Sequence, residues 1–310
     1  MSDPAALSAR ASLRHPRRSA NGPGLRPDSG LRGVALVAAS ALVWSSGGLI
    51  ARLLESADSW TTIFWRSASA GLFLLAFLAM RDGRKMFPLF RKMGWPGLGV
   101  GFFFASASIS FVVALSLTSV AKTLVIMSCT PLLAAIFGRV FLGEPVRPAT
   151  WLTIAAVMGG ITLMVSDSYG SGSALGDVFA FLIPVSFAGV IVITRRYREI
   201  RMTPAACAGA AIAMLASLAY AAPFSVTVHD LPLLVLFGAG QLGAGMALFV
   251  TGARLIPAAH TALLGMLEPI LGPIWVWLAL GERPSQAVLV GGTIVIASIL
   301  AKTLLDITRR

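Results

Sequence analysis

The sequence has little charge for its length of 310 residues. Only 12% of the residues are Asp, Glu, Lys or Arg, whereas 56% are hydrophobic, and an average soluble domain carries about 25% charged residues. A water-soluble globule of this size needs far more polar surface than this composition supplies. The composition therefore excludes a soluble enzyme and a disordered chain, and it indicates a protein that crosses a lipid bilayer several times.

Acidic residues and cysteines are scarce as well. The 13 Asp and Glu stand against 25 Lys and Arg, which gives a net charge of +12. Such a charge suggests nucleic-acid binding in a soluble protein, but a membrane protein gathers basic residues in its cytoplasmic loops whatever its function. Cys129 and Cys207 both lie in apolar stretches, so we expect no disulfide framework and no thiolate metal site.

Motifs of several enzyme classes are absent too. The sequence contains no Gly-Lys and no His-Glu dipeptide, which excludes a Walker A loop and an HExxH metalloprotease. His15, His229 and His260 lie in different regions, so we expect no metal and no other cofactor. An intramembrane enzyme needs a nucleophile and a base at one depth, but Glu268 and His260 are separated by about 12 Å along one helix. We therefore expect no enzyme.

Apolar runs follow one another along the chain after a basic segment. Residues 1–32 contain six Arg and four Pro, which predicts a disordered basic tail. Each later run has about 20 residues, the length of a helix that crosses a membrane. The pattern predicts an all-α polytopic membrane protein with ten spans, near 33–54, 60–80, 94–116, 119–141, 148–166, 174–194, 203–223, 231–253, 257–280 and 286–306.

The positions of Lys and Arg predict the orientation. With a cytoplasmic N-terminus, 21 of the 25 Lys and Arg fall in the tail and in segments on the cytoplasmic side. The opposite orientation places these residues outside, against the positive-inside rule. Both termini are therefore expected in the cytoplasm, and the basic composition requires no nucleic acid as a partner.

The sequence repeats itself at an offset of 138 residues. PLLAAIFGRVFLGE, residues 131–144, aligns with PILGPIWVWLALGE, residues 269–282, and further upstream the offset becomes 141. The repeated unit contains five spans, and because five is odd the second copy enters the membrane inverted relative to the first. Inverted repeats are typical of secondary transporters, whose central site opens to the two sides in turn.

Two five-span halves that each carry this Pro-then-LGE pattern resemble the EamA-type transporters of the drug/metabolite transporter superfamily. The resemblance covers residues 33–306 and implies a first repeat at 33–166 and a second, inverted repeat at 174–306. It implies a small-molecule substrate, with amino-acid export by alternating access as the first expectation and multidrug or organic-cation efflux as the alternative. It also implies a bacterial cytoplasmic (inner) membrane and a central cavity lined mainly by spans one, three, four, six, eight and nine. Since the fused halves supply both sides of a cavity, we expect a monomer.

Two prolines lie near the middle of equivalent spans. Pro131 and Pro269 each remove a helix hydrogen bond and free the carbonyl four residues back, here those of Met127 and Gly265. Irregular backbone at this depth is tolerated where protein or a watery cavity satisfies it. The symmetric placement predicts hinges or substrate contacts, and packing kinks are the alternative.

A carboxylate precedes the second proline. Glu268 at mid-membrane costs about 2.5–3.5 kcal/mol on insertion scales, so we expect a role in substrate binding, with a structural partner for Arg66 as the alternative. Its counterpart in the first repeat, Thr130, is uncharged, and we expect it, like Arg66, among the substrate-binding residues. Arg66 lies about 9 Å inside its own span, where interior pairing and snorkelling to the interface are both open.

Further candidates for substrate binding lie near span ends and in the interior. Lys122 and His260 are equivalent in the two repeats and lie at opposite ends of the pathway. The alternative to substrate binding is snorkelling to the interface for Lys122 and a helix-end hydrogen bond for His260. Trp44 and Trp275 lie further inside their spans than interface anchors do. Gln241 lies within the glycine run GAGQLGAG, residues 238–245, which otherwise indicates close helix packing.

Overall fold

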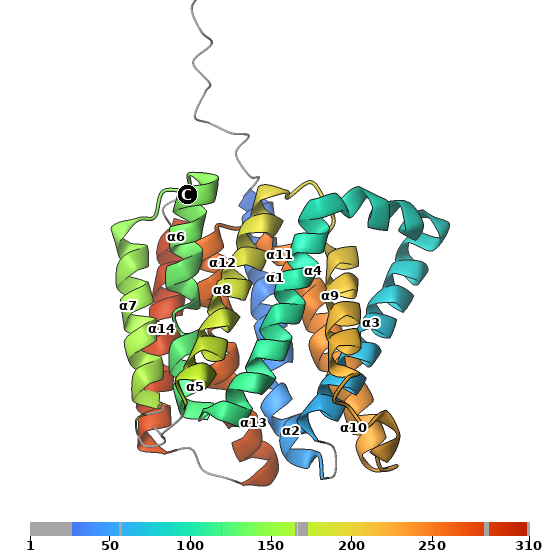
Figure 1. Cartoon of the computed structure of the whole chain (residues 1–310). Helices are drawn as coiled ribbons and strands as arrows, with labels where there is room; N and C mark the ends of the chain where they lie inside the picture. The colour runs from blue at the N-terminus through green and yellow to red at the C-terminus, as the bar shows by residue number, and fades with distance from the viewer. Residues whose placement is uncertain are drawn as a thin grey trace, which may run out of the picture.

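The structure is a computed structural model that describes residues 27–55, 58–118, 120–164, 166, 173–281 and 285–308. Within these ranges the regular elements are helices (Figure 1). The first half of the chain forms α1 (Pro27–Ser45), α2 (Gly47–Leu53), α3 (Ser59–Asp82), η2 (Gly83–Lys85), α4 (Met86–Leu117), α5 (Val120–Met127), α6 (Thr130–Leu142) and α7 (Pro148–Met164). The second half forms α8 (Ala174–Arg196), α9 (Thr203–Ser217), η4 (Pro223–Ser225), α10 (Asp230–Val235), η5 (Leu236–Ala244), α11 (Gly245–Ala253), α12 (Ala258–Gly265), α13 (Glu268–Leu280) and α14 (Gln286–Thr308).

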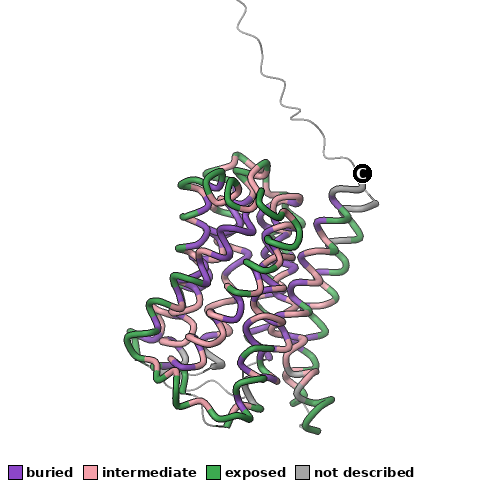
Figure 2. The backbone as a smooth tube through the Cα atoms, turned by 90° about the vertical axis from the view of Figure 1, so that its right-hand side faces the viewer, coloured by how far each residue is buried: buried purple, intermediate pink, exposed green. Residues whose placement is uncertain are grey.

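The outer surface of the bundle is apolar, as a membrane protein requires. Six helical segments are long and apolar enough to cross a membrane, and three further helices are apolar but shorter. Large apolar side chains point outward, among them Leu72, Met80, Leu152 and Leu278, each at least 69% exposed. Figure 2 shows buried residues toward the interior and exposed residues on the outward faces and at both ends. Such a surface is suited to lipid contact.

The first predicted span differs from the structure in two ways. α1 begins at Pro27, inside the predicted tail, rather than at Gly33. The run to Leu54 is also not one helix, because a turn at Ser46 separates α1 from α2. The Ser45 and Ser46 hydroxyls donate to the carbonyls three residues back, at 2.6 and 2.8 Å. These bonds compete with the helix, and glycines follow directly, a combination that kinks helices.

The repeat seen in the sequence reappears in the helix boundaries. α5 and α12 begin and end at positions 138 residues apart, and so do α6 and α13. Each second helix ends at a glycine in the left-handed region, Gly143 with φ 67° and Gly281 with φ 72°, a conformation that other residues adopt at a cost. Figure 1 shows α5 below α6 but α12 above α13, so the two broken helices run in opposite directions.

The breaks in these helices lie at the residues just before the prolines. Ser128 and Cys129 form the turn between α5 and α6. The prediction that the Met127 carbonyl is left free is wrong, because the Thr130 hydroxyl donates to it at 2.6 Å. The equivalent position of the second repeat holds Glu268, which has no hydroxyl to donate. The two breaks therefore share their backbone plan and differ in their side-chain chemistry.

The helix bundle has two ends, which are named here by the elements that lie at each of them. The terminal end is the end of the bundle at which α1 begins and α14 ends. The far end is the opposite end, where α2 and α10 lie and where α13 ends (Figure 1).

Candidate substrate site

A central cavity lies inside the bundle, beside the two helix breaks. Its volume is about 110 Å³. Met127, the last residue of α5, and Glu268, the first residue of α13, both line it. Arg66 lies two turns from the start of α3 and Phe111 less than two turns from the end of α4, and both of these helix ends are at the far end. The cavity therefore reaches from the breaks toward the far end.

Arg66 and Glu268 bring opposite charges to the central cavity. Among the described residues that line it, these two are the ionisable ones. The Arg66 Cζ lies 4.5 Å from the centre of the Phe237 ring, a separation at which a cation and an aromatic face attract. Arg66 and Glu268 also attract each other. A site with a guanidinium and a carboxyl group is electrostatically complementary to the two ends of a zwitterion when both groups are ionised.

Gln241 connects Arg66 to the break in α1. Its side-chain oxygen accepts a hydrogen bond from Nη2 of Arg66 at 3.1 Å, and its Nε2 donates to the Trp44 carbonyl at 2.7 Å. That carbonyl lies at the end of α1, where carbonyls lose their helical partners. Gln241 belongs to η5, a π-helix, and such segments are rare and frequent at functional sites. A Cβ on Gly47 would lie 2.8 Å from Nε2 of Gln241, so the absence of a side chain there permits this contact.

Trp44 forms an aromatic wall of the central cavity. Its ring lies 6.0 Å from the Phe187 ring, edge to face, and 5.1 Å from the Phe249 ring. A Cβ on Gly245 would collide with the indole nitrogen. The buried Nε1 of Trp44 and the buried Nε of Arg66 find no hydrogen-bond acceptor within the described part of the chain. Buried donors of this kind normally have partners, and the Trp44 nitrogen lies against the Gly245 backbone.

Other predicted site residues lie outside the central cavity. Trp275 lies beside the α1 break, because its Nε1 donates to the Ser45 hydroxyl at 2.8 Å, and it is not among the described residues that line the central cavity. His260 lies at the terminal end, with Nε2 3.2 Å from Nζ of Lys302. The side chain of Lys122 lies outside the described residues.

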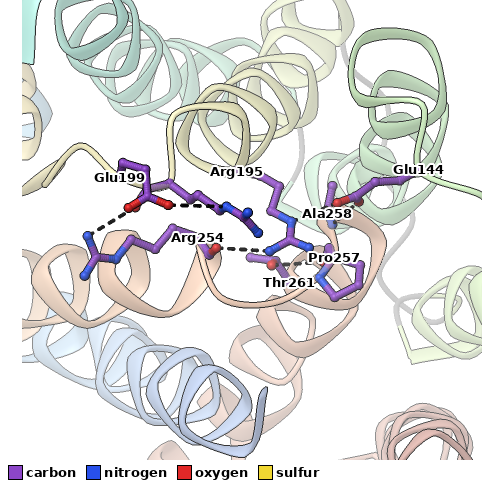
Figure 3. A network of polar contacts seen from close by, with 8 residues as sticks. Glu144, Arg195, Glu199, Arg254, Pro257, Ala258 and Thr261 are labelled. Carbon is purple, nitrogen blue, oxygen red and sulfur yellow. Dashed lines mark hydrogen bonds and ion pairs between the residues drawn. The ribbon is translucent and has the colours of Figure 1, made fainter. Parts of the chain in front are cut away.

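A second cavity, the terminal-end cavity, lies between α6, α7, the end of α8 and the start of α12. Its volume is about 340 Å³, and the residues that line it include Arg147 and His260. Glu144 also lines this cavity and contacts two residues of the second repeat. One of its carboxylate oxygens accepts a hydrogen bond from Nε of Arg195 at 2.8 Å, and the other accepts one from the Ala258 amide at 3.2 Å (Figure 3). Arg195 also donates to a backbone carbonyl of the α11–α12 connection, at 3.1 Å.

The sequence shows Glu144 only as the last residue of the LGE pattern. Its role is not visible there, because its partners are 51 and 114 residues away in the chain. One local signal was available. Pro257, the residue that precedes α12, has no side-chain acceptor and makes no cap, so the first amide of α12 requires an acceptor from elsewhere.

Comparisons with known proteins agree with this architecture. The profile of the EamA-like transporter family matches residues 31–166 and 174–303. One solved crystal structure is similar with a TM-score of 0.77 at 19% sequence identity, over 91% of this chain and 99% of that one. At that identity the likeness concerns the fold alone. A search of curated proteins found no significant match.

Proposed function

The chain belongs to the EamA-like transporter family, and from this premise we propose that it is a secondary transporter that exports amino acids across the cytoplasmic membrane of a bacterium. Its ten spans form two inverted five-helix repeats, 33–166 and 174–306, with both termini in the cytoplasm. The protein acts as a monomer, because the two fused repeats supply both sides of the pathway.

The polar groups of the central cavity are the observation that carries this proposal. A free amino acid presents a carboxylate and an ammonium a few ångströms apart. The guanidinium of Arg66 suits the carboxylate, and Glu268 suits the ammonium. Such a ligand leaves no charge in the membrane interior without a partner, which removes much of the cost of carrying it.

The two broken helices support alternating access. Met127 on α5 lines the central cavity, whereas Ala134 on α6 lines the terminal-end cavity, about 10 Å further along the same broken helix. In the second repeat the order is reversed: Ala259 on α12 lines the terminal-end cavity, and Glu268 at the start of α13 lines the central cavity. Pro131 lies between the two cavities along its broken helix, and Pro269 directly follows Glu268, so a hinge at these breaks changes the route of a solute without unfolding a helix.

The alternative is efflux of drugs or organic cations, with Glu268 as the counter-charge. The aromatic rings of Trp44 and Phe187 favour a cation. Two features oppose this alternative. Arg66 repels a cation in the same cavity, and 110 Å³ is small beside the roughly 300–1,000 Å³ of pockets for drug-sized ligands.

Uptake into liposomes that contain the purified protein tests the proposal. The solutes are radiolabelled L-phenylalanine, L-leucine and L-threonine, each compared with the amine that lacks the carboxylate: phenethylamine, isopentylamine and 1-amino-2-propanol. We expect saturable uptake of at least one amino acid and little uptake of its amine. Uptake of the amines in preference to all three amino acids would favour the organic-cation alternative.

A further inference from the structure

The terminal-end cavity has no role in the binding of a solute in the central cavity, yet it is the larger of the two. Its wall brings together residues of both repeats. Glu144 follows α6 in the first repeat, whereas Arg195 and Ala258 belong to the second. The side chains of Arg195 and Glu144 are only 13% and 23% exposed, so their ion pair is partly withdrawn from water and joins the two repeats at the terminal end.

The chemistry of the Glu144 contacts is that of a carboxylate receptor. Each oxygen has one donor, the Arg195 guanidinium on one side and the amide of Ala258 on the other. The amide opens α12, where the helix dipole adds a partial positive charge. Arg147 and His260, on the same wall, keep the surroundings basic. Any free carboxylate that enters the cavity finds the same two donors.

We propose that the terminal-end cavity is the loading site for the carboxylate of the transported amino acid, which takes over the two contacts now made by Glu144. This inference rests on the proposed function. The released Glu144 carboxylate then pairs with the ammonium of the same amino acid. The exchange leaves every charge with a partner, and it removes one polar link between the two repeats at the terminal end.

The geometry connects this exchange to the pathway. The residues that close the cavity precede α12 and follow α6, the two helices whose other ends lead to the breaks at the central cavity. Freeing Glu144 from Ala258 therefore removes one of the contacts that hold the two broken helices together at the terminal end, where Gly138 of α6 also packs against Ala258. A solute that lacks a carboxylate pairs with Glu144 alone and leaves Nε of Arg195 and the α12 amide without an acceptor, which opposes opening.

The first arm of the test uses no solute. A single cysteine replaces Ala134, a fully buried residue in the wall of the terminal-end cavity, in a Cys129→Ala, Cys207→Ala background in lipid nanodiscs. The measurement is the rate of labelling by a membrane-impermeant thiol reagent. Glu144→Gln removes the ion pair and is expected to raise the rate about tenfold. Glu199→Gln is the control, because Glu199 belongs to the same polar network (Figure 3) but pairs with Arg198 within the second repeat, at 3.5 Å. Its ion pair does not join the two repeats, so its loss should leave the rate unchanged.

The second arm adds phenylalanine, leucine or threonine, or the amine that corresponds to each, to the protein with Glu144 intact. The amino acid that is transported should raise the labelling rate, and its amine should not. An unchanged rate in Glu144→Gln would contradict the closing role of Glu144. Equal effects of an amino acid and its amine, or no effect of a transported amino acid, would contradict the loading site while leaving the proposed function intact. Absence of liposome uptake for all three amino acids would instead contradict the proposed function. If, in that case, none of the three raised the labelling rate at position 134 either, the loading site would be rejected too.

Discussion

Thr130 and Glu268 occupy equivalent positions in the two repeats, yet only Glu268 lines the central cavity. Thr130 begins α6 and donates to the Met127 carbonyl at 2.6 Å, whereas Glu268 begins α13 and shares the cavity with Arg66. Within one backbone plan, the first repeat thus uses this position to satisfy its broken helix. The second repeat uses it to bring a charge to the site.

This difference predicts opposite phenotypes for substitutions at the two positions. Glu268→Gln should lower transport about ten- to hundredfold, the equivalent of the ~1.5–3 kcal/mol of a charged hydrogen bond, with little loss of thermal stability. Thr130→Val should keep transport and lose about 1 kcal/mol of stability with its hydrogen bond. Uptake and thermal unfolding are measured on both variants after equal insertion is confirmed. Unchanged uptake in Glu268→Gln between pH 5.5 and 8 would remove Glu268 from the site.

Gln241 should matter for both stability and transport. Gln241→Leu leaves the Trp44 carbonyl without its donor and the Arg66 Nη2 without its acceptor, at about 1–3 kcal/mol for each buried group left unsatisfied. Gln241→Glu keeps an acceptor for Arg66 but removes the donor to Trp44. We therefore expect an intermediate loss of thermal stability in Gln241→Glu, and two variants that unfold at the wild-type temperature would refute this role.

Much of this arrangement could be predicted from the sequence. The offset of 138 residues predicts equivalent helices, and the depth of Glu268 and Arg66 predicts interior charges. The break at Ser46 was not predicted, because the hydropathy of residues 33–54 is continuous and the cause is local bonding by two serine hydroxyls. The contact of Glu144 with Ala258 depends on packing between repeats, and no local pattern specifies its partner.

Close packing around Trp44 predicts a selective effect of one glycine. In Gly245→Ala the new methyl group collides with the indole of Trp44, so we expect a loss of about 1–3 kcal/mol from overpacking and a displaced cavity wall. Gly159→Ala in α7 is the matched control, because nothing lies within 4 Å of a Cβ placed there, and its helix propensity gain is up to ~1 kcal/mol. Equal unfolding temperatures and equal uptake in the two variants would argue against the tight Trp44 site.

An ion pair beyond the expected second span predicts a pH dependence of stability. Arg201 donates to both oxygens of Asp82, at 2.7 and 2.9 Å, and these hydrogen bonds hold the pKa of the carboxyl below its usual value. A lowered pKa in the folded state stabilises the protein above the unfolded pKa of about 3.9, and this contribution is lost as the pH falls through the folded value. The stability difference between wild type and Asp82→Asn should therefore shrink from about pH 5 to about pH 3. A difference independent of pH would show that the charge of Asp82 does not contribute.

Alternating access is the central claim, and the accessibility of the two cavities tests it most directly. Single cysteines replace Ala107, in the central cavity, and Ala134, in the terminal-end cavity, in a background without Cys129 and Cys207. Labelling by a membrane-impermeant thiol reagent is measured with and without the transported amino acid. We expect the amino acid to shift the two labelling rates in opposite directions, because one side closes as the other opens. A simultaneous rise at both positions would describe a pore and contradict the account.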